Sequence, residues 1–214
     1  MSHAILVGVG PGIGLATAQR FAREGFALSL LSRTPQPHAD ALSGEGFSVR
    51  AYPADVGDAS GLNAALERSL SEQGAAEVLL YNAALLRPGG NLALAAQDFE
   101  AALRINVGGA LVATQAVLPA MLEQGRGTVL MTGGGLALNP SARYGALSVG
   151  KAALRVLALT LAQELEPQGI HVATLTVSAG VKPGSETARR IAEAFWALHT
   201  QPRAAWEAER VFSA

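Results

Sequence analysis

The sequence predicts an α/β fold in which one doubly wound parallel sheet carries helices on both faces. Short apolar runs alternate with longer segments of helical period along the chain of 214 residues. The short runs are apolar at successive positions, which is typical of parallel strands that are buried on both faces. A glycine-rich turn follows the first run directly, as at a strand-to-helix connection. This alternation of strands and helices indicates a doubly wound domain.

The expected elements follow one another in a regular order. Strands are expected over residues 4–9, 27–31, 48–52, 77–81, 127–132 and 171–177. Helices are expected over residues 11–24, 59–73, 98–124, 144–168 and 187–199. Glycine follows several of these helices, as it commonly does at helix ends. Because no linker, charge block or repeat divides the chain, we expect one domain over residues 1–214, with a short C-terminal helix and tail from about residue 185.

The composition excludes several classes of protein. The net charge is −1, so no overall field attracts nucleic acid or an anionic membrane. The sequence has no cysteine, which excludes a disulfide scaffold, an iron–sulfur cluster and a thiol nucleophile. The four histidines show no metal-ligand spacing, and we expect them at the surface or at strand ends. The first residues, Met1-Ser2-His3, form no basic region before a short apolar run, so we expect a cytoplasmic protein without a membrane span.

The glycine-rich turn has the character of an anion site. It reads Gly8-Val9-Gly10-Pro11-Gly12-Ile13-Gly14 and lies between the first strand and the first helix. Glycines let the backbone approach a ligand closely, and the free N–H groups of a helix N-terminus can face a pyrophosphate. The spacing G-x-x-x-G-x-G, at Gly8, Gly12 and Gly14, differs from the ordinary dinucleotide motif and from the Walker A loop. A tight connection that binds nothing is the alternative, although the turn holds more glycine than a chain reversal needs.

With this glycine spacing the chain resembles the short-chain dehydrogenase/reductase family, and further motifs extend the resemblance over about residues 4–182. Asp55-Val56 follows the third strand, where the family holds the adenine ring. Asn82 stands in Tyr-Asn-Ala-Ala at the end of the fourth strand, Asn106 inside the next helix, and Lys151 at the start of Lys-Ala-Ala-Leu. The resemblance implies a Rossmann-type fold, an oxidoreductase activity and a nicotinamide dinucleotide cofactor.

The resemblance also implies which residues hold the cofactor: Gly8, Gly12, Ile13, Gly14, Arg33, Asp55, Val56, Asn82 and Lys151. The residue that selects between the two nicotinamide cofactors lies about twenty residues past the glycine turn. An acid there would bind the ribose 2′-hydroxyl of NAD(H), whereas a guanidinium binds the 2′-phosphate of NADP(H) by charge-assisted hydrogen bonds. The second strand ends at Arg33 and no carboxylate lies nearby, so we expect NADP(H) in preference to NAD(H). An ordinary solvated arginine is the alternative.

The catalytic positions depart from the family pattern. In the family, a tyrosine four residues before the lysine transfers the carbonyl proton, and a serine thirteen residues before that tyrosine polarises the carbonyl. In this sequence those two positions hold Leu147 and Gly134, while Asn106 and Lys151 keep the other two catalytic positions. A leucine cannot transfer a proton. The half of the site that performs the proton chemistry is therefore altered, and the cofactor half is largely kept.

Tyr144 is the candidate substitute for the missing tyrosine. It lies one helical turn before Leu147 and on roughly the same face of the expected helix. It precedes Lys151 by seven residues, which is about 10.5 Å of helical rise against about 6 Å for the family spacing. The greater distance weakens the effect of the lysine on the phenol. A packed or partly exposed tyrosine without a catalytic role is the alternative interpretation.

Two functions fit these residues. The first is an NADP(H)-dependent oxidoreductase acting on a small carbonyl or alcohol, with Tyr144 or water handling the proton; the sequence does not identify the substrate. The second is a catalytically inactive NADP(H)-binding sensor, scaffold or partner subunit. Leu147 and Gly134 favour the second function, and the family resemblance favours the first.

Two features of the sequence bear on assembly and on the substrate pocket. The helical segments 101–121 and 147–165 are apolar around most of their circumference, so we expect a homodimer or a homotetramer. The connection that follows Ser178-Ala179-Gly180 is short. It predicts an open pocket, or one that another subunit or the Trp206 tail completes.

Overall fold

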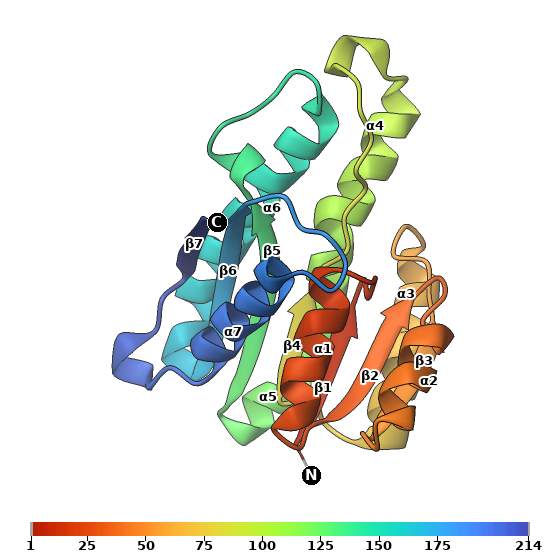
Figure 1. Cartoon of the computed structure of the whole chain (residues 1–214). Helices are drawn as coiled ribbons and strands as arrows, with labels where there is room; N and C mark the ends of the chain where they lie inside the picture. Colours follow the sequence, from red (N-terminus) through yellow and green to blue (C-terminus); the bar gives the residue numbers. More distant parts are fainter. Residues whose placement is uncertain (1, 214) are drawn as a thin grey trace.

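The computed structural model describes residues 2–213 of the chain. Its parallel strands form one sheet in the order β3-β2-β1-β4-β5-β6-β7 (Figure 1). The chain begins in the interior of the sheet at β1, builds outward to β3, and returns to β4 before building outward to β7. The order therefore reverses between β1 and β4, and open α/β sheets bind ligands at such a switch point, beyond the carboxyl ends of the strands.

The predicted fold class is confirmed. In chain order the strands β1 to β7 are His3–Val7, Ala27–Ser32, Val49–Pro53, Val78–Tyr81, Gly127–Gly134, Ile170–Ser178 and Glu209–Ser213. The helices α1 to α7 are Ile13–Arg23, Gln36–Gly44, Ala59–Gln73, Ala96–Leu103, Gly109–Gln124, Gly145–Leu165 and Glu186–His199. Each expected strand overlaps an observed one, and the expected helix at residues 59–73 has the observed bounds of α3.

Two apolar layers hold the helices to the sheet. Helices α3, α5 and α6 share one buried cluster with one face of the sheet, and α1, α2 and α7 share a second cluster with the other face. In β1, Ile5 and Val7 belong to the first cluster, whereas Ala4 and Leu6 belong to the second. Burial of both faces explains why this strand is apolar at successive positions.

Two elements have no counterpart among the expected ones. Helix α2 is short and buries only Ala39 and Leu42, so its sequence carries little apolar periodicity. Strand β7 pairs with β6 at the edge of the sheet. Its Glu209 accepts two hydrogen bonds from Arg155 Nε and Nη2 and a third from Thr176 Oγ1. A charged residue whose carboxylate is hydrogen-bonded in this way is compatible with an edge strand. It also interrupts the apolar pattern from which strands are predicted.

The long expected helix at residues 98–124 is interrupted. Helix α4 ends at Leu103, a π-helical turn occupies Arg104–Gly108, and α5 begins at Gly109. The turn contains Asn106, which is fully buried. The interruption therefore falls at a residue that the sequence singles out for the active site, as π-helical turns often do.

Two helical stretches, Ala96–Gln124 and Gly145–Gln168, are long and apolar enough to cross a membrane by length and composition. Both lie against the sheet, and their inward residues, such as Val117 and Leu154, belong to the first buried cluster. The same apolar character is expected of helices that cover a central sheet. The apolar sequence of these stretches is thus accounted for in part by the core.

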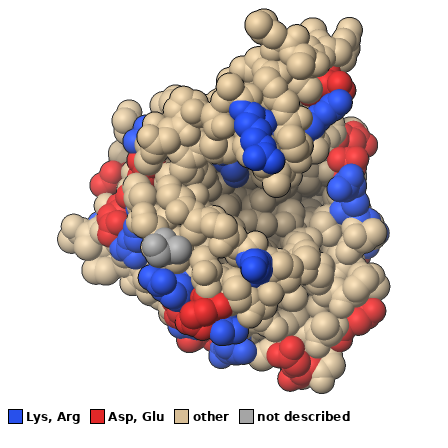
Figure 2. Space-filling model, turned by 45° about the horizontal axis from the view of Figure 1, so that its top comes forward, with Lys and Arg blue, Asp and Glu red and all other residues tan. Residues whose placement is uncertain are grey.

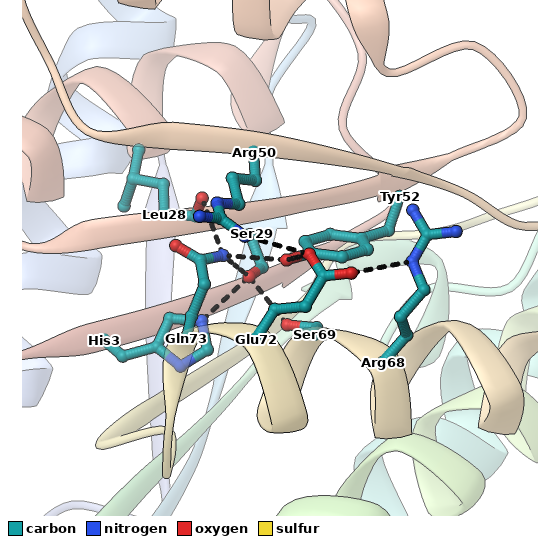
Figure 3. Close-up of polar contacts among 9 residues, drawn as sticks. All are labelled: His3, Leu28, Ser29, Arg50, Tyr52, Arg68, Ser69, Glu72 and Gln73. Atoms are coloured by element: carbon teal, nitrogen blue, oxygen red, sulfur yellow. Dashed lines mark hydrogen bonds and ion pairs between the residues drawn. The ribbon is translucent and has the colours of Figure 1, made fainter.

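Two of the histidines occupy strand ends, one of the two kinds of position expected for them. His3 and His171 lie near the starts of β1 and β6, as strand-end residues, but both are buried. Two hydrogen bonds stabilise His3 there. They join Nδ1 to Gly74 O at 2.9 Å and Nε2 to Ser29 Oγ at 2.8 Å. Figure 3 shows this histidine in a network of polar side chains between the sheet and α3. Hydrogen bonding thus permits burial of a polar ring at the end of a strand.

Candidate active site

The glycine turn connects β1 to α1 at the switch point. Gly8 has a φ of +87°, and a Cβ atom there would overlap the backbone of Ala83, which follows β4. A Cβ at Gly14 would lie 3.0 Å from the Cα of Val9 and 3.2 Å from Nδ2 of Asn82. These two glycines are required by the close approach of neighbouring chain segments, not only by a ligand. The first turn of α1 carries no acidic residue, so the positive end of its dipole is not neutralised locally.

A first cavity of about 410 Å³ lies beside this turn. Its lining includes Gly8, Arg33, Asp55, Val56 and Asn82. The structure therefore brings together residues from the ends of β1, β2, β3 and β4 that the sequence predicted to bind one cofactor. Asp55 is oriented by its own backbone, since its Oδ1 accepts a hydrogen bond of 2.8 Å from Gly57 N.

A second cavity of about 620 Å³ adjoins the first and shares Asn82 and Ala84 with it. Its lining includes Ile13, Gly134, Leu147 and Lys151, which come from α1, β5 and α6. Figure 2 shows this end of the molecule, where the surface is hollowed and Lys and Arg side chains stand around the hollow. Of the predicted site residues, Ile13, Asn82 and Lys151 thus meet in one space. Gly12 begins α1 beside them.

Asn82 is held in one orientation by hydrogen bonds to two strands. Its Nδ2 donates to Gly8 O at 2.8 Å, and its Oδ1 accepts from Thr132 Oγ1 at 2.9 Å. The amide therefore ties the glycine turn to the end of β5. This role of Thr132 was not predictable from the sequence, because the contact joins residues 50 positions apart.

Lys151 is buried, with 7% of its surface exposed, and Nζ donates to Thr132 O at 2.6 Å. Its stem lies along Gly134, where a Cβ atom would come within 3.3 Å of Lys151 Cγ. Burial lowers the pKa of the Lys151 ammonium from 10.5 to about 8, because removal from water disfavours the charged form. Burial thus brings the deprotonation of Lys151 closer to neutral pH.

Asn106 and Lys151 lie on adjoining segments of backbone. Oδ1 of Asn106 accepts a hydrogen bond of 2.8 Å from Leu85 N, and its buried Nδ2 has no partner among the described residues. A Cβ atom at Gly150 would lie 2.7 Å from Asn106 Cβ. The absence of a side chain at Gly150 therefore lets α6 approach the π-helical turn at the residue that precedes Lys151.

Leu147 and Tyr144 occupy different surroundings. Leu147 is buried and lines the second cavity, one helical turn before Lys151. Tyr144 stands just before the first residue of α6, half-buried, with the Arg143 guanidinium 5.6 Å from the centre of its ring. It is not among the residues that line either cavity. Its catalytic role stays a prediction.

Several lining residues of the second cavity were not identified from the sequence. Leu86, Leu136, Asn139, Val177 and Val181 complete its wall together with Ser178. Leu136 and Asn139 come just after Gly134, the position that holds a serine in the family. The apolar residues after Gly134 could have indicated this wall of the cavity. Whether their side chains point into the cavity, however, depends on the direction that the chain takes after β5.

Sequence comparison assigns the family. Residues 2–192 match the family described as short chain dehydrogenase. The oxidoreductase UcpA of Escherichia coli is 34% identical over 174 residues, which cover 79% of this chain and 65% of that protein. Dehydrogenase/reductase SDR family member 4 of Sus scrofa is 34% identical over 166 residues, 75% of this chain and 59% of that protein. The chain thus spans about 65% or less of the length of these two relatives.

Solved structures share the fold over the whole chain. A short-chain dehydrogenase from Rhodopseudomonas palustris superposes with a TM-score of 0.89 at 24% identity, covering 100% of this chain and 98% of that one. An alcohol dehydrogenase from Thermococcus sibiricus, complexed with 5-hydroxy-NADP, superposes with a TM-score of 0.87 at 25% identity, covering 99% and 96%. A doubly wound sheet with a glycine turn at its switch point and a buried lysine beside it defines a class of dinucleotide-dependent oxidoreductases. This chain belongs to the short-chain dehydrogenase/reductase family.

Proposed function

We propose that this protein is an NADP(H)-dependent oxidoreductase that interconverts a small carbonyl compound and its alcohol. The observation that carries the proposal is the junction of two cavities at Asn82, one beside the glycine turn and one containing Lys151. The bound dinucleotide supplies the hydride. The protein would orient the dinucleotide and the substrate and would supply the proton.

The lining residues fit a nicotinamide dinucleotide. The narrow turn at Gly8 and Gly14 and the N-terminus of α1 suit a pyrophosphate. Asp55 and Val56 would hold the adenine, and Arg33, which is exposed at the rim of the first cavity, would bind the 2′-phosphate. Gly12, Ile13, Asn82 and Lys151 would hold the nicotinamide half. The complex of the Thermococcus sibiricus relative with 5-hydroxy-NADP supports the choice of cofactor.

The second cavity favours an uncharged substrate with a substantial apolar part. Most of its lining side chains are aliphatic, and Lys151 is the one ionisable group among those lining residues that the structure describes. Apart from the Lys151 ammonium, a carboxylate or phosphate on the substrate would find no cationic partner among the described lining residues. Asn139 and Ser178 offer an amide and a hydroxyl for a neutral polar group. We therefore expect simple aldehydes, ketones or secondary alcohols to be better substrates than their acidic analogues.

The alternative function, an inactive NADP(H)-binding sensor, scaffold or partner subunit, rests on Leu147 and Gly134. Both line the cavity in which the family has its tyrosine and serine. A chain that binds the cofactor and performs no chemistry would still need every feature of the first cavity. Binding alone therefore does not separate the two functions, but turnover does.

The test combines calorimetric titration of the protein with NADPH and NADH and a turnover assay on neutral aldehydes, ketones and alcohols. We expect tighter binding of NADPH and measurable oxidation of NADPH by at least one carbonyl. Binding of NADPH without turnover of any compound would favour the inactive function. A failure to bind either dinucleotide would contradict both.

We also propose that the protein forms a homodimer or homotetramer through α5 and α6. Leu111 and Leu122 on α5, and Val149 and Val156 on α6, are exposed although large and apolar. Sedimentation velocity should give a dimer or a tetramer, and Val156→Glu should shift it toward the monomer. Val211→Glu, at an equally exposed valine on β7, is the matched control and should leave the mass unchanged. A wild-type monomer at all concentrations would contradict this arrangement.

A further inference from the structure

We propose that Nζ of Lys151 is itself the group that gives a proton to the substrate oxygen and takes it back. This inference rests on the proposed oxidoreductase function and assigns its proton chemistry. In the family pattern a tyrosine performs that step, and its position here is Leu147. The lysine would then be a catalytic residue in direct contact with substrate, not only a support for a neighbouring phenol.

The first argument is the chemistry of the cavity wall. The side chains that line the second cavity are aliphatic, amide, hydroxyl or absent, apart from the ammonium of Lys151. Of the hydroxyls, that of Thr132 is engaged with Asn82. Tyr81 is buried with its hydroxyl donating to Ile105 O, and burial raises its pKa well above the ordinary value. Lys151 is therefore the one lining group between residues 2 and 213 that exchanges protons near neutral pH.

The second argument is the placement of the ammonium. A protonated Nζ has three N–H groups, and Thr132 O accepts one of them at 2.6 Å. That contact fixes the end of the side chain at the strand terminus while the remaining N–H groups stay available. The residues at positions 134 and 147 are smaller than the serine and tyrosine of the family pattern. Gly134 places no side chain against the lysine stem, and Leu147 offers no competing hydroxyl.

The proton step balances without a further reagent. As the hydride reaches the carbonyl carbon, the π bond of the carbonyl breaks and its electron pair goes to oxygen. The oxygen takes a proton from Lys151 Nζ, which leaves an alcohol and a neutral amine. Water returns the proton to Nζ through the open mouth of the cavity. In the reverse direction the neutral amine accepts the alcohol proton.

The charges around Lys151 are consistent with this assignment. Burial, which holds its pKa near 8, places a general acid close to the working pH, where such acids are most effective. Strand β5 contributes no titratable side chain, and in β6 the titratable residue is His171, at the opposite end. In the segments packed against α6, Asp98 pairs with Arg87, and Glu100 and Arg104 are exposed. These groups leave Nζ without a direct carboxylate partner in the described part of the chain.

The first readout of the test needs no substrate. The sequence contains two lysines, Lys151 and Lys182, so labelling lysine Cε with ¹³C gives two signals to follow by NMR. The Lys182→Arg variant removes one and assigns the other. The Lys151 signal of the full chain should titrate near pH 8. The rate of carbonyl reduction should fall with rising pH through the same midpoint when measured on the NADPH complex.

The second readout uses Lys151→Arg and Lys151→Ala. Arginine keeps a cation for the cofactor but does not release its proton, so Lys151→Arg should bind NADPH within about threefold of wild type and lose about 10²–10⁴-fold in turnover. Ethylamine, which fits the space of the lost side chain, should restore part of the rate of Lys151→Ala. Lys182→Arg is the matched control and should retain full activity.

The outcomes separate this inference from the proposed function. Wild type that binds NADPH but turns over no carbonyl would overturn both. Turnover that survives Lys151→Arg, or a rate that does not follow the NMR midpoint, would overturn the role of Lys151 while the oxidoreductase function stands. The role of Lys151 would be supported if the reduction rate and the NMR signal had the same pH midpoint, if Lys151→Arg lost turnover, and if ethylamine restored part of the rate of Lys151→Ala.

Discussion

Thr132 donates its hydroxyl hydrogen to Oδ1 of Asn82 at 2.9 Å, and this bond joins the ends of β5 and β4. Because Nδ2 of the same amide donates to Gly8 O, the threonine fixes the glycine turn through one intermediate residue. The candidate site therefore depends on a side chain whose hydroxyl is engaged within the protein.

Thr132→Val should loosen the glycine turn and weaken NADPH binding by about fivefold, which corresponds to about 1 kcal/mol for one hydrogen bond. Calorimetric titration measures the change. Thr174→Val is the matched control, since Thr174 is a buried threonine of β6 that donates to Met131 O at 3.3 Å. It should lose stability without a change in affinity, and equal affinity losses in both variants would refute the link to the turn.

Arg33→Gln should weaken NADPH binding by about ten- to a hundredfold, because a charge-assisted hydrogen bond contributes about 1.5–3 kcal/mol. NADH lacks the 2′-phosphate, so its affinity should hardly change. Both dissociation constants are measured at the same ionic strength. Arg23→Gln, an exposed arginine at the other end of α1, serves as control and should leave both constants unchanged. An equal loss for both dinucleotides would contradict the role of Arg33.

Gly8→Ala should strongly destabilise the fold, whereas Gly10→Ala should not. At Gly8 a Cβ atom would overlap the backbone of Ala83, and the φ of +87° is itself strained for alanine. At Gly10 no atom lies within 4 Å of the added Cβ. The expected loss at Gly8 is at least about 1–3 kcal/mol from the backbone strain alone, measured by urea unfolding. Similar unfolding midpoints for the two variants would show that the turn can shift to accept a side chain.

Stability should fall as the pH drops below about 6.5. Burial lowers the pKa of His3, His171 and His199 from the ordinary value of 6.5, so the folded protein favours their neutral forms. As the pH falls, these histidines take up protons in the unfolded chain before they do so in the folded protein. Their contribution to stability is therefore fully present above pH 6.5 and is lost as the pH falls through their pKa values in the folded protein. Urea unfolding across this range measures the slope.

His3→Gln should make that slope shallower, because it removes one of the buried imidazoles. Figure 3 shows His3 next to Ser29, whose hydroxyl also contacts Ser69 and Gln73. A glutamine can keep a hydrogen bond there without taking up a proton. His38→Gln, at a partly exposed histidine of α2, is the control and should keep the wild-type slope. A slope that is equal in both variants would exclude His3 as a source of the pH dependence.

Gly134→Ser with Leu147→Tyr restores the residue types that the family has at these positions. A Cβ atom at 134 would lie 3.3 Å from Lys151 Cγ, so the lysine stem must move by a few tenths of an ångström. We expect the double variant to raise kcat/KM by at least about tenfold, since a positioned phenol is an additional general acid. Both single variants should gain less. No gain in the double variant would mean that the rest of the cavity cannot present a carbonyl to this position.

The interior strands of the sheet were predictable from the sequence because burial on both faces leaves a continuous apolar run. Edge strand β7 was not predictable, because it contains a charged residue, Glu209. The carboxylate is stabilised within the strand by hydrogen bonds from Arg155 and Thr176. Helix α2 was missed because it buries few apolar residues. The interior and the edge of the sheet thus follow different sequence rules.

The candidate site was predictable where parallel strands end side by side. Gly8, Arg33, Asp55 and Asn82 line one cavity because each follows a neighbouring strand. The direction of a side chain across that edge was less predictable. The contact of Lys151 with Thr132 O depends on the depth of α6 above the sheet, which Gly150 sets by its approach to the π-helical turn.

The π-helical turn at Arg104–Gly108 also constrains how the chain tolerates a change of length. A π-helical turn holds one residue more than the α-helical turn it replaces. Deleting one residue of this turn would let α4 and α5 join in a continuous α-helix with little change in their relative rotation, because the extra residue is accommodated within a single wider turn. Asn106 would then leave its place beside Leu85 N. A single deletion within α5 would instead rotate the segments on its two sides by about 100° relative to each other. The fold should therefore tolerate a one-residue deletion better in the π-helical turn than in the adjoining α-helix, although the contact of Asn106 is lost.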